Sequence, residues 1–292
     1  MRCQPESYVI KNHSRICDQG RILPGLVDWA EEWYSGRYRE RLQGLSAGRQ
    51  DQWIANSGRL VKIVIISDIH GNLEALTGLP ENFDQLWVLG DLVNYGPNPG
   101  EVVDFVRTNA SVVIRGNHDH AIGFNEDPRC SPPFREMARA MQEYTSSILS
   151  ESQKQFLRDL PLRVDRELRG MKVSLCHAVP SDPLFAYCPP GSSRWQSELE
   201  IAKADILLVG HTHLTFDRQL GKRRVVNPGS VGQPKTGTPE ACYAVWDDGT
   251  IELRSFEYPF EKTIRKIDAL PIPAGVKASL SDVLRNGGLI KA

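Results

Sequence analysis

The chain has 292 residues, of which 40% are hydrophobic and 24% are charged, so it is long enough for one large α/β domain with an appendage or for two domains. This composition excludes disorder along the whole chain. The 35 basic and 36 acidic residues give a formal net charge of -1, which excludes a global electrostatic attraction to nucleic acid or anionic lipid.

The first 60 residues differ in pattern from the rest of the chain. Apolar residues recur at helical spacing between Leu23 and Leu45, which predicts one amphipathic helix. We expect residues 1–60 to be an N-terminal extension that is either poorly ordered or packed on the following domain. A partner-binding or membrane-surface helix is the functional alternative.

The targeting and redox features are those of a cytoplasmic protein. No run approaches the ~18 consecutive apolar residues of a membrane span, and charges interrupt the N-terminus where a signal peptide would be apolar. The 6 cysteines are scattered without a Cys-x-x-Cys pair, which favours free thiols. We therefore expect a cytoplasmic localisation and no membrane span.

From Leu60 onward, short apolar runs alternate with helical or Gly/Pro-rich segments, which predicts a layered α/β domain. Most runs are nearly continuous and rich in Val and Ile, so we expect strands that are covered on both faces. The predicted strands lie at residues 60–67, 85–90, 111–116, 171–176, 204–210, 223–229, 242–247 and 250–258.

Helical patterns lie between several strands and in the C-terminal tail. Ser150 followed by Gln153 is the signal of a capping box, and Pro161 marks the end of the helix that it starts. Residues 259–292 carry two further helical patterns around Pro271 and Pro273, which we expect to form a helical tail packed on the domain. The predicted helices between strands are Pro133–Thr145, Glu151–Leu160 and Glu198–Lys203.

Five of the predicted strands end in a residue that can bind a cation. In open α/β sheets, ligands gather beyond the carboxyl ends of strands, so we expect these residues to converge. Each alone has an ordinary alternative, such as a turn, a helix cap or a core histidine, but burying all of them without a cation would leave unpaired groups that cost about 1 to 3 kcal/mol each. The residues are Asp68 and His70 after the first strand, Asp91 after the second, Asn117 and His118 after the third, His177 after the 171–176 strand, and His211 and His213 after the 204–210 strand.

These side chains are sufficient for two cation sites. A carboxylate can bridge two ions about 3.5 to 4 Å apart, so Asp91 can belong to both sites. Mixed carboxylate, amide and imidazole ligands without a thiolate suit two divalent ions of Mn, Fe, Ni or Zn better than Ca²⁺. These ligand types do not distinguish among the four metals, and Mn is our first guess. One site would use Asp68, His70, His213 and Asp91, and the other would use Asn117, His177, His211 and Asp91.

The order of these motifs resembles that of the calcineurin-like metallophosphoesterase superfamily, over residues 61 to 258. The segments 90–97 (GDLVNYGP) and 227–234 (NPGSVGQP) resemble its small bacterial phosphodiesterase branch. The resemblance implies an α/β fold, a four-layer α-β-β-α sandwich of two facing mixed β-sheets flanked by helices, with a dinuclear metal site at the C-terminal ends of the strands. The blocks that carry it are Asp68-x-His70, Gly90-Asp91, Gly116-Asn117-His118-Asp119, His177 and Gly210-His211-x-His213.

The resemblance also implies a reaction and roles for residues. A metal-bridging hydroxide attacks the phosphorus of a phosphodiester or nucleotide in line, and the metals hold the phosphate oxygens. Asn117 and His118 then contact the substrate, and His118 is the catalytic residue that protonates the leaving oxygen. We expect a small phosphoester or nucleotide substrate and no nucleic-acid binding, and homo-oligomerisation stays open.

Two positions depart from the protein Ser/Thr phosphatases of this superfamily, which carry an Asp-Arg pair after the bridging aspartate. Here Asn94 and Tyr95 stand at those positions, so there is less fixed positive charge for a dianionic monoester. We therefore expect a diester or nucleotide substrate. Phosphomonoesterase or Ser/Thr protein phosphatase-like activity is the alternative, and a non-catalytic scaffold on the same fold is the alternative of another class.

The start of the resemblance raises a question about residues 1–60. Val61 heads a run that resembles the beginning of the relatives. The segment before it is therefore either the product of a start codon assigned too far upstream or a real accessory segment. Further along the chain, we expect residues 121–169 to lie over or beside the site.

Overall fold

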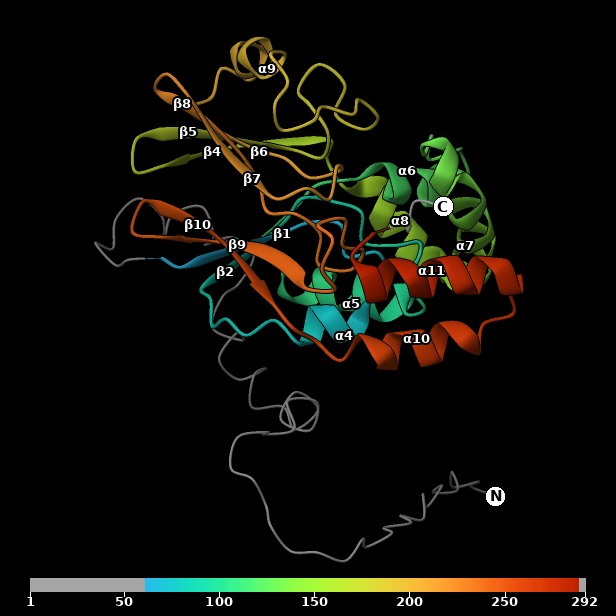
Figure 1. Cartoon of the computed structure of the whole chain (residues 1–292). Helices are drawn as coiled ribbons and strands as arrows, with labels where there is room; N and C mark the ends of the chain where they lie inside the picture. Colours follow the sequence, from blue (N-terminus) through green and yellow to red (C-terminus); the bar gives the residue numbers. More distant parts are fainter. Residues whose placement is uncertain (1–60, 289–292) are drawn as a thin grey trace, which may run out of the picture. The chain divides into compact units, whose positions relative to one another are not determined.

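Two mixed β-sheets face one another in the computed structural model of the protein, which describes residues 61–288 (Figure 1). Helices flank both sheets, so the predicted four-layer α-β-β-α sandwich is confirmed. The expectations for residues 1–60 and 289–292 lie outside the described residues. No helix within residues 61–288 is long and apolar enough to cross a membrane.

The first sheet consists of β1 (Ile63–Ile66), β2 (Gln85–Val88), β3 (Val112–Val113), β9 (Ala241–Asp247) and β10 (Thr250–Phe256). Its order is β10-β9-β1-β2-β3. β1 pairs parallel with β2, which pairs parallel with β3, whereas β9 is antiparallel to both β1 and β10. The three parallel strands therefore point their carboxyl ends to the same edge of the sheet.

The second sheet consists of β4 (Arg163–Leu168), β5 (Met171–Cys176), β6 (Ile206–Leu208), β7 (Phe216–Leu220) and β8 (Arg223–Asn227). Its order is β4-β5-β6-β8-β7. β5, β6 and β8 are parallel, and the antiparallel strands β4 and β7 form the two edges.

Strand periodicity explains the layers. Ile63 and Ile65 of β1 belong to the apolar core shared by the two sheets, and Val64 and Ile66 belong to the core beneath the helices. All four side chains are buried, because successive residues of a strand point to opposite faces and both faces are covered here. A continuous apolar run thus encodes a strand in the middle of a sandwich.

Helices cover the outer faces of both sheets (Figure 1). α4 (Leu73–Thr77), α5 (Pro99–Asn109) and α8 (Glu151–Asp159) pack on the first sheet, and α9 (Trp195–Ala202) packs on the second. The predicted capping box of α8 is confirmed: the backbone N–H of Gln153 donates to Ser150 Oγ at 3.3 Å, and that of Ser150 donates to Gln153 Oε1 at 3.0 Å.

A third group of helices lies beside the sandwich. α7 (Arg135–Ile148), α10 (Phe260–Asp268) and α11 (Ala274–Asn286) share an apolar cluster that includes Met141 and Ile267. Tyr95, from the loop after β2, also belongs to this cluster. The helices therefore support a loop that leads to the polar end of the sheets.

The sequence prediction missed both edge strands of the second sheet. β4 and β7 each have a single buried residue among exposed and half-buried ones, so they lack the continuous apolar run of the central strands. It also missed α4, α5 and α6 (Asn117–Phe124), which begin directly after strand loops. The residues that open α6 belong to the candidate site, and their polar side chains conceal the helical pattern.

Candidate metal centre

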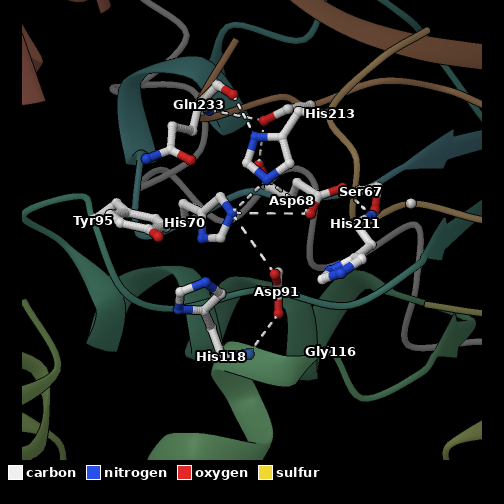
Figure 2. A network of polar contacts seen from close by, with 12 residues as sticks. Ser67, Asp68, His70, Asp91, Tyr95, Gly116, His118, His211, His213 and Gln233 are labelled. Atoms are coloured by element: carbon white, nitrogen blue, oxygen red, sulfur yellow. Dashed lines mark hydrogen bonds and ion pairs between the residues drawn. The ribbon is translucent and has the colours of Figure 1, made fainter. Parts of the chain in front are cut away.

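The loops that follow five strands bring all the sequence-predicted site residues together. Figure 2 shows the carboxylates of Asp68 and Asp91 beside the imidazoles of His70 and His213, with His118 on the far side of Asp91. Two sets of three side chains place their ligand atoms within 4.8 Å of one another and also match the expected grouping: Asp68 with His70 and His213, and Asp91 with His177 and His211.

The first cluster consists of three acceptor atoms that face one another. His70 Nε2 lies 3.2 Å from His213 Nε2, and His213 Nε2 lies 3.3 Å from Asp68 Oδ1. Asp68 Oδ1 is buried and has no hydrogen-bond partner among the described residues. Burial holds the pKa of His70 well below its usual value despite the Asp91 charge, so this imidazole stays neutral.

Backbone carbonyls fix the tautomers of this cluster. The ring nitrogen Nδ1 of His70 donates to the Val93 carbonyl at 3.1 Å, and that of His213 donates to the Gln233 carbonyl at 2.6 Å. Because a carbonyl can only accept, Nδ1 carries the proton of the neutral ring and Nε2 carries its lone pair. Two lone pairs and a carboxylate oxygen that converge without a donor fit a cation, and the chemistry of the donor set is that of a metal site.

The second cluster repeats this arrangement. His177 Nδ1 donates to the Leu89 carbonyl at 2.7 Å, which leaves the Nε2 lone pair 3.2 Å from Asp91 Oδ2. Asn117 Nδ2 donates to the Pro128 carbonyl at 2.8 Å, so its Oδ1 faces the cluster. That oxygen lies 3.1 Å from His177 Nε2 and 3.1 Å from His211 Nδ1.

Without a cation, the second cluster attracts a proton instead. Burial alone would lower the pKa of His177, but the neighbouring Asp91 carboxylate raises it to about 9. In the same way, burial alone would raise the pKa of Asp91, but His177 and His118 hold it well below its usual value. A divalent ion would thus replace a proton at His177 Nε2.

Asp91 connects the two clusters through a single oxygen. Its Oδ2 lies 3.8 Å from His70 Nε2 and 3.2 Å from His177 Nε2, one from each cluster. Its Oδ1 accepts the backbone N–H of His118 at 2.8 Å. Gly116 makes this approach possible, because a Cβ there would lie 2.1 Å from Asp91 Oδ1.

The backbone of the site is held in an unusual conformation. A left-handed residue other than glycine costs about 1 to 2 kcal/mol, and such residues concentrate at functional sites. Hydrogen bonds from Asp68 N to the Gly90 carbonyl and from His70 N to the Asp91 carbonyl hold the first loop in place. The predicted ligands with positive φ are Asp68 (53°), His70 (50°), Asp91 (56°), His211 (65°) and His213 (59°).

Comparison with known proteins agrees with this geometry. A model of the calcineurin-like phosphoesterase superfamily domain matches residues 61–249. The chain belongs to this superfamily. It is 31% identical over 228 residues to an uncharacterized protein of Methanocaldococcus jannaschii, which covers 70% of this chain and 91% of the relative.

Two further similar proteins support the small bacterial phosphodiesterase branch of the superfamily. The chain is 28% identical over 209 residues to the phosphodiesterase YfcE of Escherichia coli, across 66% of this chain and 91% of the relative. A crystal structure of a metallophosphoesterase from Sphaerobacter thermophilus is 28% identical with a TM-score of 0.65, and the match covers 77% of this chain and 100% of that one. The protein is therefore a metal-dependent phosphoesterase.

His118 of this phosphoesterase lies beside the clusters, with its ring centroid 5.0 Å from that of His70. Asn94 Nδ2 contacts His118 Nδ1 at 2.7 Å. The Asn94 amide is oriented by two further bonds, since its Oδ1 accepts the Tyr95 N–H at 3.0 Å and its Nδ2 donates to the Ala138 carbonyl at 3.2 Å. Nδ1 of His118 is therefore an acceptor, and this network assigns the proton to Nε2.

Sequence reasoning missed the roles of the residues around His118. Asn94 and Tyr95 were noted only as departures from another group, yet both have positive φ and both are buried. Cys130 was treated only as a free thiol, but its Sγ lies 3.4 Å from His118 Nε2 and 3.3 Å from Tyr95 Oη. No local pattern could have brought residues 36 positions apart to one imidazole.

Asp119 is a second residue whose role the sequence did not reveal. Its carboxylate accepts the backbone N–H groups of Asp91 and Leu92 at 2.8 Å each and that of Gly116 at 3.0 Å. Burial and then the Asp91 charge raise the pKa of Asp119 to about 7, although the backbone donors oppose the rise. Asp119 thereby joins the loop after β2 to the start of α6. Its position three residues after Gly116, where helices often carry a capping carboxylate, was the available signal.

Proposed function

We propose that this phosphoesterase hydrolyses a phosphodiester or a nucleotide at a centre that holds two divalent ions. The observation that carries the proposal is the convergence of acceptor atoms in two clusters on the one oxygen Asp91 Oδ2. A single cation could not contact both clusters, because each has its own set of three ligands. A proton could not neutralise the facing lone pairs and the unpartnered Asp68 Oδ1 together.

Each ion would have four protein ligands. The donor set of oxygen and imidazole nitrogen fits Mn, Fe, Ni or Zn, with Mn the first choice. One ion would be held by Asp68, His70, His213 and Asp91, and the other by Asn117, His177, His211 and Asp91.

The ions would supply Lewis acidity, which makes a bound water a nucleophile near neutral pH and offsets charge on the phosphate oxygens. The chain supplies the proton for the leaving group. His118 presents Nε2–H, and Asn94, itself bound to the Ala138 carbonyl, holds the opposite ring nitrogen Nδ1. His118 thus donates to the departing oxygen without needing to be an imidazolium. Asn117 Oδ1 remains available to its ion because Nδ2 is bound to Pro128.

The surroundings of His118 support the diester or nucleotide over a phosphomonoester. In place of an aspartate that would accept from the imidazole, Asn94 donates to it. In place of an arginine that would grip a dianion, Tyr95 contributes a phenol whose pKa burial raises well above its usual value, so it stays neutral. The substrate we propose is a small phosphoester or nucleotide, and nucleic acid is not required.

Hydrolysis of two chromogenic esters tests the proposal. The chelator-treated protein should be inactive, and Mn²⁺ should restore hydrolysis of bis(p-nitrophenyl) phosphate at a higher kcat/KM than that of p-nitrophenyl phosphate. Elemental analysis should find two ions per chain. Faster hydrolysis of the monoester would reverse the substrate preference. Two bound ions with no hydrolysis of either ester or of a nucleotide panel would favour the non-catalytic scaffold.

A further inference from the structure

The loop that follows β8 is bound closely to the candidate metal centre. Its Ser230 Oγ donates to the Asp68 carbonyl at 2.7 Å, and the backbone N–H of Gly232 donates to the same carbonyl at 3.0 Å. The carbonyl of Gln233 accepts Nδ1–H of His213 at 2.6 Å. The residues of this loop are therefore fixed relative to the first cluster.

Lys235 lies two residues after Gln233 in this loop, and its side chain is half-buried. Its ammonium is 4.5 Å from the centre of the Phe134 ring, in the 3-10 helix η1 (Pro132–Phe134). Within residues 61–288, it makes no hydrogen bond or ion pair with another side chain or carbonyl. A cation–π contact at this distance orients an ammonium but does not neutralise its charge.

The charges around Lys235 belong to the metal centre. Burial lowers the pKa of the Lys235 ammonium, and Asp68, Cys130 and Asp91 oppose this shift by attraction. The same ammonium acts on His211 of the second cluster, where it helps to lower the imidazole pKa. Two contacts place Lys235 beside the site. Gln233, two residues earlier, accepts from His213, and Phe134, which the ammonium covers, follows Cys130, whose Sγ lies 3.4 Å from His118 Nε2.

Metal binding changes the balance of charge around this lysine. Two divalent ions would neutralise Asp68 and Asp91, which are the carboxylates that attract Lys235. The half-buried ammonium would then face two cations, and only Cys130 would be left of the three groups that attract it. An isolated charge that has lost part of its hydration is costly, so the loaded centre needs an anionic ligand near Lys235. A substrate phosphoryl group provides that charge at this place.

We propose that Lys235 is a phosphate-binding residue whose ammonium hydrogen-bonds a non-bridging oxygen of the substrate. This inference rests on the proposed function. Lys235, in the loop after β8, would then provide the positive charge for the phosphate that Tyr95 does not provide. A lysine is a point charge that needs only one oxygen, whereas an arginine fork pairs with two. A diester has only two non-bridging oxygens, so Lys235 leaves one of them for the ions alone.

The test measures phosphate binding separately from turnover. Inorganic phosphate is titrated calorimetrically into the Mn²⁺-loaded wild type and into Lys235→Met, and diester kinetics are measured on both. We expect Lys235→Met to weaken phosphate binding and to lower kcat/KM by about ten- to a hundredfold, the range of a lost charge-assisted hydrogen bond. KM should change more than kcat, and metal content should stay at the wild-type value.

Four further variants accompany the test. Lys222→Met removes an exposed lysine from the β7–β8 turn and should change neither phosphate binding nor kinetics. Lys235→Arg keeps the charge and should retain binding within about threefold. Phe134→Leu removes the aromatic ring but keeps the ammonium, so it should affect binding less than Lys235→Met does. Lys235→Gln repeats the measurement with an uncharged polar group should the Met variant melt at a lower temperature.

The outcomes separate this inference from the proposed function. A wild type that hydrolyses neither ester contradicts the proposed function itself. A wild type that is active, with phosphate affinity unchanged in both Lys235→Met and Lys235→Gln, contradicts the lysine assignment alone. Equal loss in Phe134→Leu and Lys235→Met would show that the ammonium only positions η1.

Discussion

Three histidines of the two clusters and their neighbour His118 have opposite tautomers. In the neutral form of each ring, His70, His177 and His213 donate Nδ1–H to a backbone carbonyl and present a lone pair at Nε2. His118 accepts at Nδ1 from Asn94 and presents a proton at Nε2. The hydrogen bond on the far side of each ring thus separates metal ligands from a proton donor, although all are buried imidazoles in one site.

Replacement of Asp91 should abolish metal binding by the histidines of both clusters, which is the largest effect that we expect. In Asp91→Asn, an amide takes the place of the oxygen that faces both His70 and His177, so both ions lose a charged ligand. We expect metal content to fall in both clusters and turnover to fall by at least about a thousandfold. Elemental analysis and diester kinetics measure the two effects, with exposed Asp104→Asn of α5 as the control. A variant that keeps two ions per chain would contradict the bridging role.

Replacement of His118 should remove only the proton donor and leave the metal ligands in place. His118→Ala should lose about 10²- to 10⁴-fold in kcat, the usual contribution of general acid catalysis, and should keep both ions. His120→Ala, two residues along the same helix, is the matched control and should leave kcat unchanged. If metal content and rate fell together in His118→Ala, the division between ligands and donor would be wrong.

Asp119 sharpens the comparison because it holds both the loop of the ligand Asp91 and the start of α6, which carries the proton donor His118. Asp119→Asn loses one acceptor for the backbone N–H groups of Asp91, Leu92 and Gly116. We expect metal affinity to fall by about 10- to 100-fold and unfolding free energy to fall by about 1 to 3 kcal/mol. Metal titration and denaturant unfolding of the metal-free protein separate these effects. Unchanged metal affinity would show that Asp119 only caps α6.

Asn94 offers the smallest and most specific change. Asn94→Leu removes the donor to His118 Nδ1 and should lower kcat by about two- to tenfold, with metal content unchanged. Long-range ¹H–¹⁵N NMR spectra should show the His118 proton on Nε2 in the wild type and a mixture of tautomers in the variant. A wild-type proton on Nδ1 would overturn the assignment.

Much of the fold could be predicted because its central strands are buried on both faces. Continuous apolar runs such as that of Ile63 to Ile66 mark these strands without ambiguity. The edge strands β4 and β7 could not be found in this way, because water covers part of each and the apolar run is lost. The short strand β3 is only Val112–Val113, and the sequence signal extended well beyond it.

For the candidate site, the sequence predicted the ligands but not the residues that contact them. Carboxylates and imidazoles directly after strands are visible in one dimension, because parallel strands carry their ends to the same edge. Hydrogen-bond partners that come from other elements are not visible in the sequence. Asn94, in the loop that Asp91 opens, and Cys130, in the loop after α6, both contact His118, and no local pattern reveals either contact.

The sequence by itself determined which residues follow the strands and therefore which side chains can meet at the end of the sheets. Only the tertiary structure decided how those side chains are used. It fixed which ring nitrogen of His70, His177 and His213 is free, placed Asp91 Oδ2 between the clusters, and held the loop that carries Lys235 against the first cluster. The physical reason is that a ligand or a proton donor is defined by its hydrogen-bond partners, and those partners come from distant parts of the chain.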